Sequence, residues 1–166
     1  AILLLKEFMT SLGSPHMDCR QDGAKVEAFP RCSYLFNTTI SGIETADLCL
    51  LVGTNPRWEA PLVNARIRKN YLFTGLPIAS IGPHHELGYP VDHLGNDPLI
   101  LEKILKGRHP LSSQLKASKH PMMILGEGIL RREDGVALLH LAREIAEKYG
   151  FIHTMKSERH DVWNGF

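Results

Sequence analysis

A run of apolar residues that ends in an abrupt break constrains the fold of this chain most. The five residues Leu48–Val52 are apolar without alternation, which is typical of a strand buried on both faces. Residues 53–56 (Gly-Thr-Asn-Pro) then favour a tight turn. A helix is expected to begin at residues 59–61, because proline fits the first turn of a helix at little cost. Strand, glycine turn and helix in this order predict the opening unit of an open parallel α/β sheet.

The same alternation continues along the chain. We expect helices over residues 1–12, 98–106, 111–118 and 134–149, a one-turn helix within 37–44, and further strands over 76–81, 122–125 and 151–154. Residues 84–97 carry no periodicity and are predicted to be irregular, and their order is left open. Strands that alternate with helices are joined by right-handed crossovers. The sequence therefore predicts a single α/β domain over residues 1–166, with a mostly parallel, Rossmann-like sheet and helices on both faces.

Composition excludes several classes of protein. A chain of 166 residues with a formal charge of +1 fits one domain and has no global attraction to nucleic acid or acidic lipid. No apolar run approaches the roughly 20 residues that cross a bilayer. The three cysteines, Cys19, Cys32 and Cys49, have no metal-ligand or disulfide spacing, which favours a reducing compartment.

The two ends of the chain suggest a piece of a longer protein. The sequence begins with Ala1 rather than methionine and ends in a bare aromatic stretch, Trp163 to Phe166. We expect exposed apolar surface where the rest of such a protein would pack, with Trp163 and Phe166 among its contributors.

The turn at residues 53–57 is the candidate binding site. Ligands of open α/β sheets bind at the carboxyl ends of strands, and backbone N–H groups near a helix start favour a phosphate. The candidate residues are Gly53, Thr54, Asn55, Pro56 and Arg57. Neither a dinucleotide fingerprint nor a P-loop is present, and a tight turn alone is the favoured interpretation of these residues. The second glycine turn, at residues 126–128, carries Glu127, which would repel a phosphate.

Other chemistry receives less support from the sequence. Among nine histidines, His84, His85 and His93 form the densest group, but adjacent histidines point apart, and we predict no metal site. No nucleophile motif and no carboxylate pair for acid–base catalysis stand out, so we predict no catalytic residue. The basic residues Arg57, Arg66, Arg68 and Lys69 could contact an anion, although cations also suit a helix end by themselves.

Several segments closely resemble the large iron–sulfur subunit of respiratory complex I, the NADH:quinone oxidoreductase, in its bacterial form or its mitochondrial counterpart. The resemblance covers nearly all of residues 34–135, and the segments that carry it are YLFNTTI at 34–40, ETAD at 44–47, LVGTNPRWEAPLVNARIRK at 51–69, DHLG at 92–95, HP at 109–110 and the stretch from KHPM to G at 119–135.

The resemblance implies a structural part of the peripheral arm of that complex. The parent passes electrons from NADH through iron–sulfur clusters to quinone, and those clusters belong to a cysteine-rich N-terminal region that is not in this sequence. The partners implied are the rest of the same subunit and other peripheral-arm subunits, with neither nucleic acid nor membrane insertion. The location implied is the cytoplasmic face of the bacterial inner membrane, or the mitochondrial matrix side.

The matching region is also similar to molybdopterin-dependent oxidoreductases. In those relatives the loop that matches Gly53 to Pro56 helps to hold a pterin guanine dinucleotide, and the next strand typically ends in Asp-Pro-Arg, whose acid helps to read the guanine. Here the matching place reads Gly82-Pro83-His84, without a carboxylate. The resemblance therefore implies an inherited fold with a lapsed cofactor site and no cofactor in this chain. The alternative is a binding module that still takes a nucleotide or another anion at residues 53–57.

Overall fold

The computed structural model describes residues 2–17, 23–26, 34–152 and 163–166. The described residues form a four-stranded sheet in the order β3-β2-β1-β4, in which every neighbouring pair is parallel. The strands are β1 (Leu48–Val52), β2 (Ile78–Ile81), β3 (Asp92–Gly95) and β4 (Pro121–Leu125). The predicted parallel α/β architecture is therefore confirmed.

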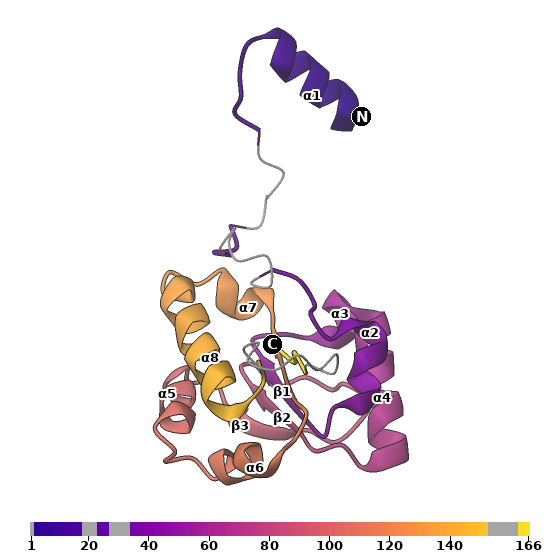
Figure 1. Ribbon diagram of the computed structural model, residues 1–166, viewed down its shortest axis with the longest axis vertical. Helices are drawn as coiled ribbons and strands as arrows, with labels where there is room; N and C mark the ends of the chain where they lie inside the picture. Colours follow the sequence, from indigo (N-terminus) through magenta and orange to yellow (C-terminus); the bar gives the residue numbers. More distant parts are fainter. Residues whose placement is uncertain (1, 18–22, 27–33, 153–162) are drawn as a thin grey trace, which may run out of the picture.

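Helices cover both faces of this sheet. Figure 1 shows α2 and α4 on one side of the strands and α5 and α8 on the other. The helices in chain order are α1 (Ile2–Ser11), α2 (Thr39–Gly42), the 3-10 turn η2 (Ile43–Thr45), α3 (Pro56–Glu59), α4 (Pro61–Thr74), α5 (Leu99–Leu105), α6 (Leu111–Ala117), α7 (Glu127–Leu130) and α8 (Gly135–Tyr149). The long helix was expected to begin within residues 59–61; α4 begins at Pro61, and Glu59 ends the short α3 that precedes it.

Strand β1 is buried along its whole length, as its unbroken apolar run predicted. Leu48, Leu50 and Val52 belong to one core cluster, which also contains the buried residues of α5, α6 and α8. Cys49 and Leu51 point to the other face, where they belong to a second cluster with Ile43, Ile67 and other residues. A central strand with two buried faces needs apolar residues at every position, because successive side chains alternate between the faces.

The buried amide of Asn70 joins α4 to the segment that precedes β1. Its Nδ2 donates to the carbonyl oxygens of Ile43 at 2.8 Å and Ala46 at 2.9 Å. The Asn70 residue is only 3% exposed, so these hydrogen bonds satisfy a polar group that would otherwise be costly to bury.

Two predictions about strands are corrected. The predicted strand over residues 151–154 is not found in its described half, where Ile152 makes only an isolated antiparallel bridge to Asn164; residues 153 and 154 lie outside the described residues. Conversely, β3 lies within residues 84–97, which were predicted to be irregular. The strand β3 is at the edge of the sheet and has no buried residue, so its sequence lacks the apolar pattern that marks a strand.

The last four residues lie along the free edge of β4. Gly165 accepts a hydrogen bond from the Met123 backbone at 2.7 Å and donates one to the Phe151 carbonyl at 2.7 Å. Trp163 donates through Nε1 to the Pro121 carbonyl at 2.7 Å. This segment therefore covers part of a strand edge that would otherwise expose unpaired backbone groups.

The exposed apolar surface is not where the sequence suggested. Trp163 and Phe166 are half-buried and pack against the two core clusters, which corrects the expectation that they are exposed. The large apolar side chains with the greatest exposure lie on α1, α3 and α4 instead, at Ile2, Trp58, Phe73 and Leu62. In the parts of the chain that the structure describes, no helix is both long and apolar enough to cross a bilayer.

Candidate functional site

The strand order places a switch point, the usual position of a ligand crevice in such sheets, between β1 and β4. After β1 the chain adds β2 and β3 on one side, and it then returns to form β4 on the other side of β1. Ligands of open α/β sheets bind at such a reversal, beyond the carboxyl ends of the two strands. The loops at this point are residues 53–57 after β1, which we call the β1 loop, and residues 126–128 after β4, which we call the β4 loop.

These two loops are in direct backbone contact. The N–H of Gly126 donates to the Val52 carbonyl at 2.9 Å, and the N–H of Gly128 donates to the Gly53 carbonyl at 2.9 Å. A Cβ atom at Gly126 would lie 2.4 Å from the Thr54 Cβ, and one at Gly53 would lie 2.7 Å from the Ile129 backbone nitrogen. The glycines therefore serve close packing of one loop on the other, and the crevice is closed by the protein itself.

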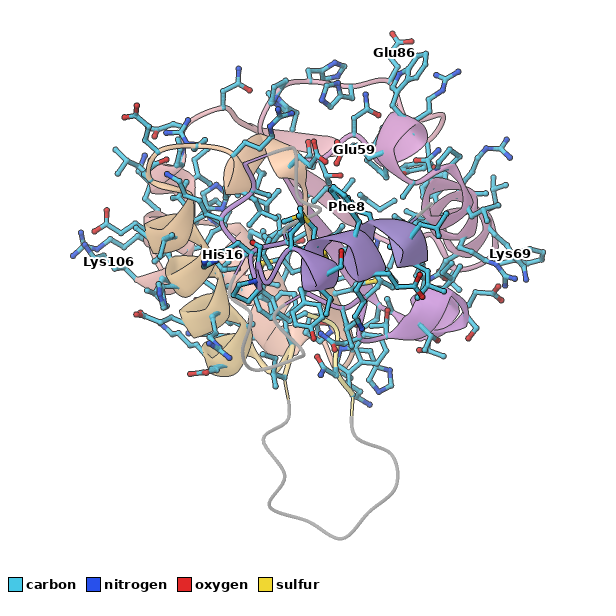
Figure 2. The ribbon with its side chains drawn as sticks, turned by 90° about the horizontal axis from the view of Figure 1, so that it is seen from above. Phe8, His16, Glu59, Lys69, Glu86 and Lys106 are labelled. Carbon is cyan, nitrogen blue, oxygen red and sulfur yellow. The ribbon has the colours of Figure 1, made fainter. Side chains whose placement is uncertain are left out.

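A carboxylate from this chain occupies the polar groups of the β1 loop. Glu59, at the end of α3, accepts hydrogen bonds from the Asn55 backbone N–H at 2.5 Å and from the Thr54 hydroxyl at 3.1 Å. Figure 2 shows the Glu59 side chain at the same end of the molecule as Glu86. An N–H group and a hydroxyl that face one anion are the elements of a phosphate site, and here Glu59 fills that position.

The site residues predicted from the sequence lie together but serve different contacts. Gly53 adopts a left-handed conformation with φ of 59°, which allows the turn, and its N–H donates to the Ile81 carbonyl at 2.8 Å. Pro56 is buried at the start of α3. Arg57 is exposed and donates to the Glu86 carbonyl at 3.1 Å, so its guanidinium binds a neighbouring loop of the same chain.

The side chain of Asn55 contributes a buried polar atom to this loop. Its Oδ1 is buried and has no hydrogen-bond partner within the described residues. Buried polar atoms without a partner are uncommon in folded proteins, so this oxygen marks the place where an additional donor would be accommodated most readily.

A small cavity lies beside the β1 loop and was not foreseen from the sequence. Its volume is about 250 Å³, and it opens among residues at the carboxyl ends of β1 and β2 and at the start of α7. Arg132 and Asn96 are the polar side chains in its lining. Arg132 is paired with Asp134 through two contacts of 2.7 Å and 2.9 Å, and this pairing raises the pKa of Arg132. The two polar lining residues, Asn96 and Arg132, come from distant segments of the chain, so no local motif could have indicated them.

The remaining basic residues of the sequence prediction make contacts within the chain. Arg66 and Lys69 of α4 both pair with Glu44, with a Lys69 Nζ to Oε2 distance of 2.9 Å. The hydrogen bonds from Lys69 and Arg66 lower the pKa of the Glu44 carboxyl. Arg68 donates to the Gly88 carbonyl at 3.3 Å. Two of these cations therefore converge on a carboxylate of this chain, Glu44, and not on a position open to an external anion.

The fold brings the rings of His84 and His93 into contact, although these residues are nine positions apart in the sequence. The rings of His84 and His93 meet edge to face with a centroid distance of 5.5 Å, and His93 Nε2 lies 2.7 Å from the Gly82 carbonyl oxygen. Among the described residues, no three His, Cys, Asp or Glu side chains are placed to hold a metal ion together.

A phosphate-bearing cofactor does not fit the two loops as they stand. Such a group would need free donors at the crevice, whereas the N–H groups of Gly53, Asn55, Gly126 and Gly128 all donate to acceptors of this chain. The strand end at residues 82–84 also contains no carboxylate that could read a base. The geometry supplies a packed junction of two loops, and no catalytic step can be derived from it.

Comparison with known proteins places this fold in a family. A family model described as molybdopterin oxidoreductase matches residues 1–164. The G-type subunit of the NADH-quinone oxidoreductase of Rickettsia bellii (strain RML369-C) is 40% identical over 166 residues, which is 100% of this chain and 23% of the relative. The corresponding protein of Rickettsia conorii (strain ATCC VR-613 / Malish 7) is 40% identical over the same length, with 24% of the relative covered.

A third relative has a similar identity over most of the chain. The corresponding NADH-quinone oxidoreductase protein of Rickettsia felis (strain ATCC VR-1525 / URRWXCal2) is 41% identical over 152 residues, 92% of this chain and 23% of the relative. The chain thus spans about a quarter of the length of these relatives. Because the family model matches almost every residue, and because the sheet is of the parallel α/β type, this chain belongs to the molybdopterin oxidoreductase family.

Proposed function

We propose that this chain is a structural domain of the large subunit of an NADH-quinone oxidoreductase. The proposal is supported by the 40% identity to the Rickettsia bellii relative over the full chain, which includes both loops of the crevice. In this proposal the parent passes electrons from NADH to quinone, through iron–sulfur clusters held elsewhere in the subunit. The domain is part of the peripheral arm and contacts the rest of its own subunit and neighbouring subunits.

The observation that carries the structural role is the carboxylate of Glu59 in the β1 loop. The donors that a nucleotide phosphate would need are Asn55 N–H and Thr54 Oγ1, and Glu59 accepts from both. A phosphate entering this place would have to displace Glu59 or would meet its negative charge. In this proposal the domain contributes shape and contact surface, and the β1 loop takes no part in chemistry.

The test is electron transfer by the assembled complex. Asn55→Ala is the informative variant, because its side-chain oxygen has no partner in the described chain and its removal should not disturb the fold. We expect the complex to assemble and the rate of NADH oxidation by quinone to stay within about twofold, a difference below 0.5 kcal/mol in activation free energy. A rate that falls tenfold or more in a fully assembled complex would show that the loop acts in the reaction.

The unpartnered Asn55 oxygen and the adjacent cavity favour a second candidate, a nucleotide-binding or anion-binding module at the β1 loop. The cavity volume of about 250 Å³ is just below the range of common small-molecule sites, which begins at about 300 Å³. This candidate requires Glu59 to swing away from the loop. A ligand-dependent rise in melting temperature distinguishes it from the structural role.

A further inference from the structure

Helix α1 has one apolar face. At about 100° per residue, six of its apolar side chains fall within an arc of about 160°, while the polar residues share the opposite side. The polar residues are Lys6, Glu7, Thr10 and Ser11, with Leu3 among them, and the apolar arc comprises Ile2, Leu4, Leu5, Phe8, Met9 and, directly after the helix, Leu12.

This face is uncovered in the chain as it stands. None of the residues Ile2–Ser11 is buried, and the exposed fractions are 86% for Ile2, 69% for Leu4 and 58% for Phe8. Helix α1 stands apart from the sheet and its helices in Figure 1, and Figure 2 shows the Phe8 side chain on it. A helix of 10 residues is marginal in water on its own, so its stability must come from packing of the apolar face.

We propose that the apolar face of α1 packs against a part of its own polypeptide that lies outside these 166 residues. This inference rests on the proposed function. The family model begins at residue 1, and the Rickettsia bellii relative aligns over the entire chain, so α1 is part of the region that the two proteins share. The chain makes up only 23% of that relative, and most of the subunit is therefore available to cover the helix.

The size of the face favours an intramolecular contact over a separate partner. A helix of 10 residues is about 15 Å long. Such a short element buries far less than the roughly 1,200 Å² typical of a specific interface between two proteins. Contact within one polypeptide does not lose translational and rotational freedom, so a face of this size is sufficient there.

The charges on α1 argue against a membrane surface as the partner that covers its apolar face. Helices that lie in a lipid interface carry several cations on their polar side. The polar side of α1 carries one cation, Lys6, and one anion, Glu7, whose charges cancel. Helix α1 therefore has no electrostatic attraction to acidic lipid.

Site-specific photo-crosslinking in the intact subunit, within its purified complex, tests this inference. The photoreactive residue p-benzoylphenylalanine replaces Phe8 on the apolar arc, and the matched control places it at Glu7, the adjacent position on the polar side. After illumination, digestion and mass spectrometry identify the crosslinked peptides. We expect the probe at position 8 to crosslink to peptides of the same subunit outside this chain, at least fivefold more than the probe at position 7.

Each other outcome overturns the inference. Crosslinks from position 8 to lipid, to a different subunit, to a second copy or to residues of this chain would contradict it, as would equal yields at the two positions or no crosslinks. Whether the subunit is present in the purified complex is assessed separately. If the complex contains the subunit while position 8 gives no intramolecular product, the inference fails and the proposed function stands. If the subunit crosslinks to itself as expected but never enters such a complex, the proposed function fails.

Discussion

The Oε1 atom of Glu59 lies 2.5 Å from the backbone nitrogen of Asn55, four residues earlier in the chain. Its second oxygen accepts from Thr54 at 3.1 Å, so one carboxylate satisfies two donors of the β1 loop. The loop has the position of a cofactor site in a parallel α/β sheet, at the carboxyl end of the central strand. The donors of this loop nevertheless bind Glu59 of the same chain. The presence of the Glu59 carboxylate where a ligand anion would bind is the basis of the structural role that we propose.

The close contact of the two glycine loops should make Gly126 intolerant of a side chain. A Cβ at this residue would meet Thr54 Cβ at 2.4 Å and the Gly53 carbonyl oxygen at 2.5 Å, and the backbone would have to move. We predict that Gly126→Ala lowers the free energy of unfolding by about 2–3 kcal/mol, the upper part of the range for overpacking, measured by urea denaturation.

Gly107→Ala is the control for this substitution. Gly107 follows a helix, but a Cβ there would have no neighbour within 4 Å, and only its φ of 71° resists the side chain. Its cost should be about 1 kcal/mol. Equal or smaller losses for Gly126→Ala would contradict the close loop contact.

Asp47 fastens the start of β1 to the start of β4. Its carboxylate accepts from the backbone N–H of Lys119 at 2.7 Å and of His120 at 3.0 Å, and also from the Ser118 hydroxyl. Asp47→Ala removes all three contacts and should lower the free energy of unfolding by about 1–2 kcal/mol, since Asp47 is exposed and water competes. Ser118→Ala removes one contact and should cost less. Similar losses for the two variants would argue against this role.

The same carboxylate gives a pH dependence with a definite sign. Partial burial raises the pKa of Asp47, but the hydrogen bonds from Ser118, Lys119 and His120 outweigh it and hold the pKa below its ordinary value of 3.8. The stability from Asp47 is therefore complete above this value and is lost as pH falls through the lower, folded-state pKa. Unfolding curves between pH 2 and 6 should show a smaller acid loss for Asp47→Asn than for the unaltered chain. Parallel curves would show that Asp47 is not responsible.

Helix α5 offers two leucines on opposite sides. Leu101 is fully buried in the core cluster beside β1, whereas Leu99 is 57% exposed. Leu101→Ala should lower the free energy of unfolding by about 2–5 kcal/mol, because it leaves a cavity. Leu99→Ala should change it by no more than about 0.5 kcal/mol. If the two variants unfold at the same urea concentration, the orientation of α5 against the sheet is wrong.

The burial of the central strand leads us to predict that the Cys49 thiol is unreactive in the folded chain. Cys49 is completely buried in β1, and burial raises the pKa of its thiol to about 12. In a variant with Cys19→Ser and Cys32→Ser, Cys49 should react with iodoacetamide only as fast as the chain unfolds. Rapid alkylation under native conditions, at a rate unaffected by stabilising salts, would contradict the buried position of β1.

The elements that could be predicted from the sequence are those whose own residues carry the signal. The apolar run of β1 and the helical periodicity of α8 are local patterns, and Gly150 ends α8 in a left-handed conformation. One detail of α8 does not follow from its apolar residues alone: Val136 is 44% exposed, because the buried stripe runs through Leu138 and Leu139.

The features that were missed depend on contacts between distant segments. Strand β3 is recognisable only through its pairing with β2, because its own residues are at least partly exposed. The lining of the cavity by Asn96 and Arg132 likewise requires the folded chain. The role of Glu59 had a local signal, an acid four residues after Asn55, but a glutamate within the first turn of a short helix is common for other reasons. Its hydrogen bonds to the loop become apparent only in the folded structure.

The central claim is that Glu59 fills the anion position of the β1 loop, and a thermal-shift titration of the chain tests it most directly. Guanosine monophosphate, guanosine diphosphate and inorganic pyrophosphate are added at up to about 10 mM, with sodium chloride at matched ionic strength as the control. We predict no shift in melting temperature beyond that of the salt control. A site with a Kd one hundredth of the ligand concentration would stabilise the fold by about 2.7 kcal/mol. A saturable rise with a nucleotide or pyrophosphate, abolished by Thr54→Ala, would contradict the claim.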